Sequence, residues 1–310
     1  MADDLLERVR ATGLLPAGAD VLVLLSGGRD SVCLLDVAVA LDCAVRALHV
    51  NYGLRDEAGE DEAHCRALCE RLGVPLAVQR ALRPADATGN LQAWARDVRY
   101  AAAAEAAGEG VIAVAHTASD QAETILYRLA SSPGRRALLG MAPRAGQLVR
   151  PLLGVTREET GAWCRLRGLQ WRDDATNATG EYARGRVRHG LLPALEAVDP
   201  RAAANVVRTA QLLRDEAEVL DVVVDSALAG RDRIAIEHLS ALPPALARLV
   251  VRRLAERATG DLCARAATRL DDILGLGDAG ALDVGDGARA VVEGGVLRFE
   301  PTPPLPVRRA

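Results

Sequence analysis

Short apolar runs alternate with amphipathic stretches through the first half of this chain. The runs, rich in Val, Leu, Ile and Ala, predict strands at 21–25, 44–50, 75–78 and 111–115. The stretches after them carry apolar residues at helical spacing and predict helices at 31–41, 57–72, 91–107 and 121–130. Alternation of this kind is typical of an α/β fold with a doubly wound parallel sheet, whose ligands bind outside the carboxyl ends of the strands.

The pattern changes after residue 200. In this second half, helical spacing predicts helices at 201–229, 243–257 and 265–274. The same spacing predicts one more helix at 2–12, at the start of the chain. Short apolar runs between Gly-rich turns predict a small closing sheet with strands at 281–284, 289–292 and 296–299. We therefore expect a catalytic α/β domain at 1–195, a smaller, mainly helical domain at 196–300, and a disordered proline-rich tail at 301–310.

Composition indicates an ordinary globular protein, with 50% hydrophobic and 26% charged residues. No apolar run approaches the roughly 18 residues of a membrane-spanning helix, and the acidic start lacks the basic region of a signal peptide. Six cysteines form no C-x-x-C pair, which favours buried or idle thiols in a reducing compartment. We expect a cytoplasmic protein with no membrane partner.

Charge is spread unevenly along the chain. The formal net charge is −4, yet residues 133–190 hold eleven arginines against five carboxylates. All 38 basic residues are arginine. A positive strip in an acidic protein is either a solvated surface or a face that meets RNA phosphates, and its location alone leaves both interpretations open.

The first strand runs directly into Ser26-Gly27-Gly28-Arg29-Asp30-Ser31 and then a helix. Glycines allow close backbone approach, and a helix N-terminus favours negative charge, so this order of elements forms an anion cradle. The two serines add hydroxyl donors, and Asp30 offers a carboxylate to a Mg²⁺ that bridges phosphates. The string lacks the Gly-Lys-Ser/Thr end of a Walker A loop. An ordinary Gly-rich turn is the alternative, and the full string favours phosphate binding over it.

Two further polar stretches follow predicted strands, at His49–Arg55 and His116–Glu123. A lone histidine at a strand end, such as His49, is more often structural than a ligand. Asp120 and Glu123 lie three residues apart and share one face of a helix that Ser119 is expected to cap. Paired carboxylates beside a phosphate site suit a cationic ligand or a metal. Taken alone, the pair is better explained by a capping arrangement that complements the helix dipole than by a ligand.

Together these motifs resemble the tRNA(Ile)-lysidine synthetases of the PP-loop, or ATP pyrophosphatase, superfamily. The resemblance covers about residues 20–195 and continues through Asn90–Arg96 with Arg99-Tyr100, Gly134, Leu139–Met141, Arg150–Leu153, Asp174–Asn177, Tyr182–Arg188 and Leu192-Pro193. The chain departs from the family pattern at Thr117, where a second His is usual, and at Ser119, where an Asp is usual. The chain resembles the shorter architecture of this family.

The resemblance implies an adenine nucleotide α-hydrolase-like fold and an AMP-forming ligase. The wobble cytidine of a CAU-anticodon tRNA(Ile) would attack ATP and release pyrophosphate, and L-lysine would then displace AMP to give lysidine. Catalytic roles would fall to Asp30, Asp120 and Glu123. The ATP site would comprise Ser26, Gly27, Gly28, Arg29, Asp30, Ser31, His49, Arg96 and His116, with Asp30 also holding Mg²⁺. Asp120 and Glu123 would bind lysine, and tRNA phosphates would meet Arg135, Arg136, Arg184, Arg186 and Arg188. The resemblance leaves the oligomeric state open.

Three other functions remain open at this point. A PP-loop tRNA cytidine thiolase would share the loop and the basic strip, although the lack of C-x-x-C pairs counts against it. A small-molecule AMP-forming synthetase would release AMP without tRNA. A non-catalytic tRNA- or nucleotide-binding module would bind ATP without releasing pyrophosphate.

Overall fold

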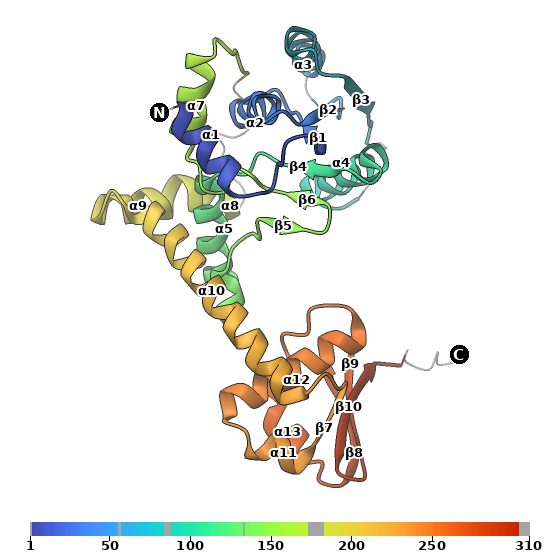
Figure 1. Ribbon diagram of the computed structural model, residues 1–310. Coiled ribbons are helices and arrows are strands. Elements are labelled where there is room, and N and C mark those ends of the chain that lie inside the picture. Colours follow the sequence, from blue (N-terminus) through green and yellow to red (C-terminus); the bar gives the residue numbers. More distant parts are fainter. Residues whose placement is uncertain (1, 55–56, 84–87, 133, 173–182, 304–310) are drawn as a thin grey trace. The chain divides into compact units, whose positions relative to one another are not determined.

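The structure is a computed structural model that describes residues 2–54, 57–83, 88–132, 134–172 and 183–303 (Figure 1). The chain forms two compact units, Met1–Leu213 and Arg214–Ala310. Their division lies inside one long helix, α10 (Ala202–Leu228), and thus later than the boundary expected at residue 195.

The first unit is built on a six-stranded sheet in the order β3-β2-β1-β4-β6-β5. All neighbouring strands are parallel except β5 and β6, which form a hairpin. The bounds are β1 (Asp20–Leu24), β2 (Ala44–Asn51), β3 (Leu76–Arg80), β4 (Val111–Ala113), β5 (Arg144–Ala145) and β6 (Leu148–Val149). The doubly wound parallel sheet is confirmed. The sequence did not reveal β5 and β6, because two-residue strands are too short for any periodicity.

Helices cover both faces of this sheet. They are α1 (Ala2–Ala11), α2 (Arg29–Ala40), α3 (Ala58–Leu72), α4 (Leu91–Ala107), α5 (Ala118–Ser131), α6 (Arg135–Leu138), α7 (Arg157–Leu166), α8 (Ala183–Arg186) and α9 (Leu192–Val198), with a π-helical turn at Val187–Leu191. Helix α3 ends at Gly73, whose φ of +66° is the left-handed cap that glycine adopts most easily. Helix α7, which the sequence analysis missed, packs against α2.

Strand β1 is buried on both sides because its side chains alternate between two apolar cores. Val21 and Val23 face the core that includes α2 and Trp163 of α7, whereas Leu22 and Leu24 face the core that includes α4. This double burial holds the end of β1, and therefore the glycine loop after it, in one position.

The second unit combines helices with an antiparallel sheet in the order β7-β10-β9-β8. Its elements after α10 are β7 (Arg233–Ala235), α11 (Ile236–Ala241), α12 (Pro244–Thr259), a 3₁₀ turn (Ala266–Arg269), α13 (Leu270–Leu274), β8 (Ala279–Gly285), β9 (Ala288–Glu293) and β10 (Val296–Pro301). Helix α12 packs on β9 and β10, with Val250 and Leu254 in the same buried cluster as Leu297. The predicted closing sheet is present, with β7 as an unpredicted fourth strand.

Two details of this unit differ from the sequence-based expectations. The helix expected at 265–274 is divided into the 3₁₀ turn and the short α13. Pro301 is the last residue of β10, and residues 304–310 of the expected tail lie outside the described part of the chain. Among the residues described, no helix combines the length and apolar character that a bilayer crossing requires.

Candidate functional site

Three polar stretches converge at the carboxyl edge of the first unit's sheet. The glycine loop follows β1, His49 lies near the end of β2, and His116 follows β4. Strands β2 and β3 lie on one side of β1, and β4 and β6 lie on the other. The change of direction between β1 and β4 is the topological switch point at which ligands of such sheets bind.

Hydrogen bonds to its own serine hydroxyls stabilise the loop after β1. The Ser31 hydroxyl donates to the Gly28 carbonyl oxygen at 2.8 Å and lies 3.1 Å from Ser26 Oγ. The backbone N–H groups of Ser26 and Gly28 donate to Ser31 Oγ and Ser26 Oγ. Gly27 has a φ of +85°, and a Cβ there would lie 3.3 Å from the Cys65 sulfur. Glycine at this position therefore satisfies both the backbone conformation and the tight packing below the loop.

His49 supports the loop from behind. Its side chain is 4% exposed, and Nδ1 lies 2.9 Å from the Leu25 carbonyl oxygen at the start of the loop. Cys65 Sγ lies 3.5 Å from the same nitrogen. The geometry gives His49 a structural role in positioning the loop, although the sequence analysis also placed it in the ATP site.

Asp120 and Glu123 lie in the first turns of α5, on one face as predicted. The N-cap is Thr117 and not Ser119: its backbone N–H and its hydroxyl both donate to Asp120 Oδ2 at 2.8 Å. Asp120 Oδ2 is thus committed to a capping box, and Oδ1 is the oxygen that turns toward the site. The capping interpretation and the ligand interpretation of Asp120 therefore apply to different oxygen atoms.

Arg157, the first residue of α7, contacts three carboxylates. Its Nη2 lies 2.6 Å from Asp120 Oδ1, Nη1 lies 3.2 Å from Glu123 Oε1, and Nε lies 3.7 Å from Asp30 Oδ2. The hydroxyl of Thr160, one turn later, donates to Asp30 Oδ1 at 2.5 Å. The sequence analysis missed both α7 residues, because their only local signal is the Thr156-x-x-Glu159 capping box that starts this helix.

Burial and the neighbouring arginines act in opposite directions on the pKa of Glu123. Desolvation raises the pKa of its carboxyl above the ordinary range, and Asp120 adds to that rise, whereas Arg157 and Arg188 oppose it. Arg188 Nε lies 3.5 Å from Glu123 Oε1. A carboxylate with a raised pKa is a better proton acceptor than an exposed glutamate.

A cluster of cationic and aromatic groups flanks this acidic region. Arg96 and Arg99 of α4 stack over the Tyr100 ring, at 4.7 and 5.4 Å from its centroid. Arg150, which follows β6 and is 8% exposed, donates from Nη1 to the Ala142 carbonyl oxygen. Within the described residues, Arg99 Nε, Tyr100 OH, His116 Nδ1 and Arg150 Nε are buried without a hydrogen-bond partner. Unsatisfied buried donors of this number are rare in folded proteins, so the cluster is suited to an anionic or nucleobase ligand.

His116 stays neutral between the acidic and basic regions. Burial, opposed by the charge of Asp120 and aided by Arg150, Arg99 and Arg96, lowers its pKa to about 4. The ring is therefore uncharged near pH 7 and available to donate or accept a hydrogen bond.

The remaining predicted arginines are placed separately. Arg29 donates from Nε to Asp30 Oδ1 at 3.2 Å. Arg135 and Arg136 are the first two residues of the four-residue helix α6, and Arg186 is exposed at the end of α8. Arg188 turns toward Glu123. The side chain of Arg184 lies outside the description, as do Asp174–Asn177 and Tyr182 of the sequence motifs.

The donor set at Asp30 fits Mg²⁺. This ion binds proteins through one or two carboxylates together with substrate phosphates, and Asp30 lies at the N-terminus of α2 directly after the loop. Among the described residues, no three His, Cys, Asp or Glu side chains form a group able to hold a metal by themselves. A carboxylate that acts jointly with bound phosphates is therefore the arrangement available here.

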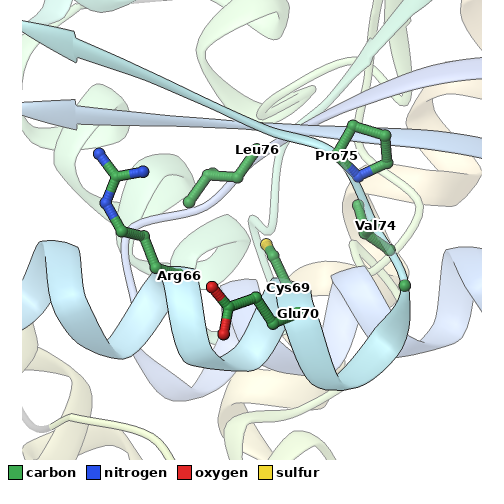
Figure 2. Close-up of a pocket in the computed structure, with 7 residues that line it drawn as sticks. Arg66, Cys69, Glu70, Val74, Pro75 and Leu76 are labelled. Carbon is green, nitrogen blue, oxygen red and sulfur yellow. The ribbon is translucent and has the colours of Figure 1, made fainter.

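A cavity of about 360 Å³ lies away from this site, between the end of α3 and the start of β3 (Figure 2). Arg66, Cys69 and Glu70 line it from the helix, and Val74–Leu76 line it from the chain that enters β3. Leu76 begins β3, so this cavity is at the amino edge of a parallel sheet whose phosphate loop is at the carboxyl edge.

Comparisons with known proteins match the part of the chain that holds this site. The PP-loop domain family matches residues 6–195. A tRNA(Ile)-lysidine synthase of Thermobifida fusca is 38% identical over 79% of this chain and 79% of its own length. One from Solibacter usitatus is also 38% identical, over 80% of this chain. This chain spans only 59% of the Solibacter protein and 62% of a Dehalococcoides mccartyi relative.

A solved structure shares the fold at low sequence identity. The U34-tRNA thiolase NcsA from Methanococcus maripaludis superposes with a TM-score of 0.58 at 17% identity, over 68% of this chain and 78% of its own. The loop after β1, the switch-point geometry and these matches lead to one conclusion: the chain belongs to the tRNA(Ile)-lysidine synthase family of PP-loop proteins.

Proposed function

We propose that this protein is a tRNA(Ile)-lysidine synthase. It uses ATP to adenylate the 2-carbonyl oxygen of the wobble cytidine in a CAU-anticodon tRNA(Ile), and then joins L-lysine to that base. The observation that carries the proposal is the meeting of a phosphate loop, a three-carboxylate cluster and an unsatisfied cationic cluster at one sheet edge. Each matches the charge of one reactant group.

The loop binds the pyrophosphate part of ATP. Backbone N–H groups at the start of α2 and the hydroxyls of Ser26 and Ser31 surround the leaving phosphates. Asp30 would hold Mg²⁺, which would supply charge neutralisation to the pyrophosphate. In the first step the cytidine oxygen forms a bond to the α-phosphorus, and the bond from that phosphorus to the β-phosphate oxygen breaks.

The acidic cluster binds lysine. Asp120 Oδ1 and Glu123 Oε1 point to the same position and suit the ammonium groups of the amino acid. In the second step the lysine ε-nitrogen bonds to C2 of the base, AMP leaves with the carbonyl oxygen, and the amine loses a proton. The raised pKa of Glu123 makes it the stronger candidate for that proton.

The cationic cluster receives the nucleotide that reacts. Arg96, Arg99 and Arg150 provide charge for a phosphate, and Tyr100 with the neutral His116 provides hydrogen bonds to a base edge. Four buried atoms of this cluster, Arg99 Nε, Tyr100 OH, His116 Nδ1 and Arg150 Nε, have no hydrogen-bond partner among the described residues, which is expected of a site that a ligand completes. Further contacts to the tRNA backbone come from Arg135, Arg136 and Arg186.

The test is transfer of labelled L-lysine to CAU-anticodon tRNA with Mg²⁺ and ATP. We expect transfer by the wild type and a loss of at least 100-fold in Asp30→Ala, because the metal and its charge are lost from the leaving group. Asp42→Asn is a matched control: Asp42 is exposed just past α2, and its φ of +58° is one that Asn adopts. Wild-type transfer rates in Asp30→Ala would remove Asp30 from the mechanism.

A further inference from the structure

Arg157 occupies the oxygen atoms that an incoming amine needs. Of the Asp120 carboxylate, Oδ2 is used by the Thr117 cap, so Oδ1 is the oxygen left for a ligand. Arg157 Nη2 holds that atom at 2.6 Å, and Nη1 holds Glu123 Oε1 at 3.2 Å. An ammonium group at this position would compete with the guanidinium for the same two atoms.

The guanidinium also keeps the unliganded cluster together. The side chains of Asp30, Asp120 and Glu123 are only 21%, 23% and 11% exposed, so solvent screens their mutual repulsion poorly. Among the described residues, Arg157, itself 17% exposed, is the group that touches all three, whereas Arg29 contacts only Asp30 and Arg188 only Glu123. The Arg157 guanidinium can therefore leave the three carboxylates only when another positive charge takes its place or a stronger anion attracts it.

A stronger anion arrives at the glycine loop. Arg157 Nε lies 3.7 Å from Asp30 Oδ2, and Asp30 is the second residue of the helix that the loop precedes. Phosphate carries more charge than a carboxylate and accepts paired hydrogen bonds from a guanidinium. Phosphate bound at the loop thus competes with Asp120 and Glu123 for Arg157.

We propose that Arg157 couples the two substrates: phosphate at the Ser26–Ser31 loop draws its guanidinium from Asp120 and Glu123 and so opens these carboxylates to the amine of L-lysine. This inference rests on the proposed function and adds to it an order, in which ATP promotes lysine binding. Linkage requires the effect to be reciprocal, so lysine strengthens nucleotide binding by the same factor.

The test is calorimetric titration of L-lysine into the protein of residues 1–310, with and without α,β-methylene-ATP and Mg²⁺. This analogue carries the phosphates but cannot be cleaved at the bond that adenylation breaks. In the wild type we expect lysine to bind at least tenfold more tightly when the analogue is present. In Arg157→Gln we expect tighter lysine binding than wild type without the analogue, and a coupling factor near one.

Two further variants make the outcome specific. Arg165→Gln, an exposed arginine on the same helix, is expected to keep wild-type coupling. Arg157→Lys keeps the charge but cannot reach three carboxylates at once, and is expected to couple less than wild type. Equal lysine affinity with and without the analogue in the wild type, or unchanged coupling in either Arg157 variant, overturns the inference. If lysine binds neither with nor without the analogue, the proposed function is contradicted as well. Failure of the coupling alone is thus distinguishable from failure of the proposed function.

Discussion

Arg157 and His116 mark two regions of opposite charge in the candidate site. Arg157 neutralises the acidic region formed by Asp30, Asp120 and Glu123. His116 lies beside the arginines of the basic region, and burial together with these arginines keeps it uncharged. A reaction between a cationic amine and an anionic nucleotide needs both regions within one crevice. Single residues therefore have effects that depend on which region they belong to.

Glu123→Gln tests the acidic region. Removing the charge that faces the lysine amine is expected to raise the KM for L-lysine roughly tenfold, because a charge-assisted hydrogen bond becomes a neutral one. Steady-state kinetics with varied lysine measures this, with ATP and tRNA saturating. Glu158→Gln, an exposed carboxylate in the first turn of α7, is the control. An unchanged KM for lysine in Glu123→Gln would remove this residue from the amine site.

His116 makes a pH-dependent contribution with a defined sign. The unfolded chain takes up a proton at this histidine near pH 6.5, whereas the folded chain does so only near pH 4. The contribution of the neutral ring to the free energy of unfolding is therefore complete above pH 6.5 and is lost as the pH falls toward 4. Histidine NMR titration, with His116→Gln to assign the signal, should give a midpoint near 4. A midpoint near 6.5 would contradict the burial and the arginine neighbours described here.

At the scale of elements, the helix pair α2 and α7 positions the acidic region. Asp36 of α2 is 1% exposed and accepts hydrogen bonds from Trp163 Nε1 of α7 and from Nε of Arg167, the residue that caps the end of α7, both at 2.9 Å. Because α2 begins at the phosphate loop and α7 begins at Arg157, this link fixes one relative to the other. Its loss should affect both folding and the site.

Asp36→Ala tests that link. The substitution leaves the buried indole N–H of Trp163 without an acceptor and removes the partner of Arg167, so we expect a loss of about 2 kcal/mol in the free energy of unfolding. Urea denaturation at pH 7 measures this loss. Asp42→Asn, at an exposed residue just past the end of α2, is the control. A loss under about 0.5 kcal/mol, the range of ordinary surface changes, would show that the link contributes little.

The same elements show what the sequence can and cannot predict. The apolar runs of β1, β2 and β4 and the string Ser26–Ser31 predicted the sheet and the phosphate loop, because strand burial and tight turns leave local signals. Arg157 and Thr160 were not predicted, because their importance comes from contacts with Asp30, Asp120 and Glu123, which are distant in sequence. The N-cap was assigned to Ser119 instead of Thr117 for a related reason: both have capping side chains, and only the backbone decides between them.

At the scale of the whole molecule, the distribution of charge along the chain bears on the choice between a tRNA and a small-molecule substrate. The acidic chain carries its positive excess between residues 133 and 190, in the unit that holds the candidate site. A small-molecule synthetase would have no use for such a strip, whereas a tRNA-modifying enzyme would. The PP-loop match ends at residue 195, so the second unit lies outside that domain.

Formation of AMP from ATP tests the central claim most directly, with L-lysine and CAU-anticodon tRNA each supplied or withheld in the presence of Mg²⁺. The account predicts sustained AMP release only when both are present, because the adenylated base forms on the tRNA and lysine must then displace AMP from it. AMP release without tRNA would contradict the account and identify a small-molecule synthetase, in which the arginines of 133–190 are only solvated surface.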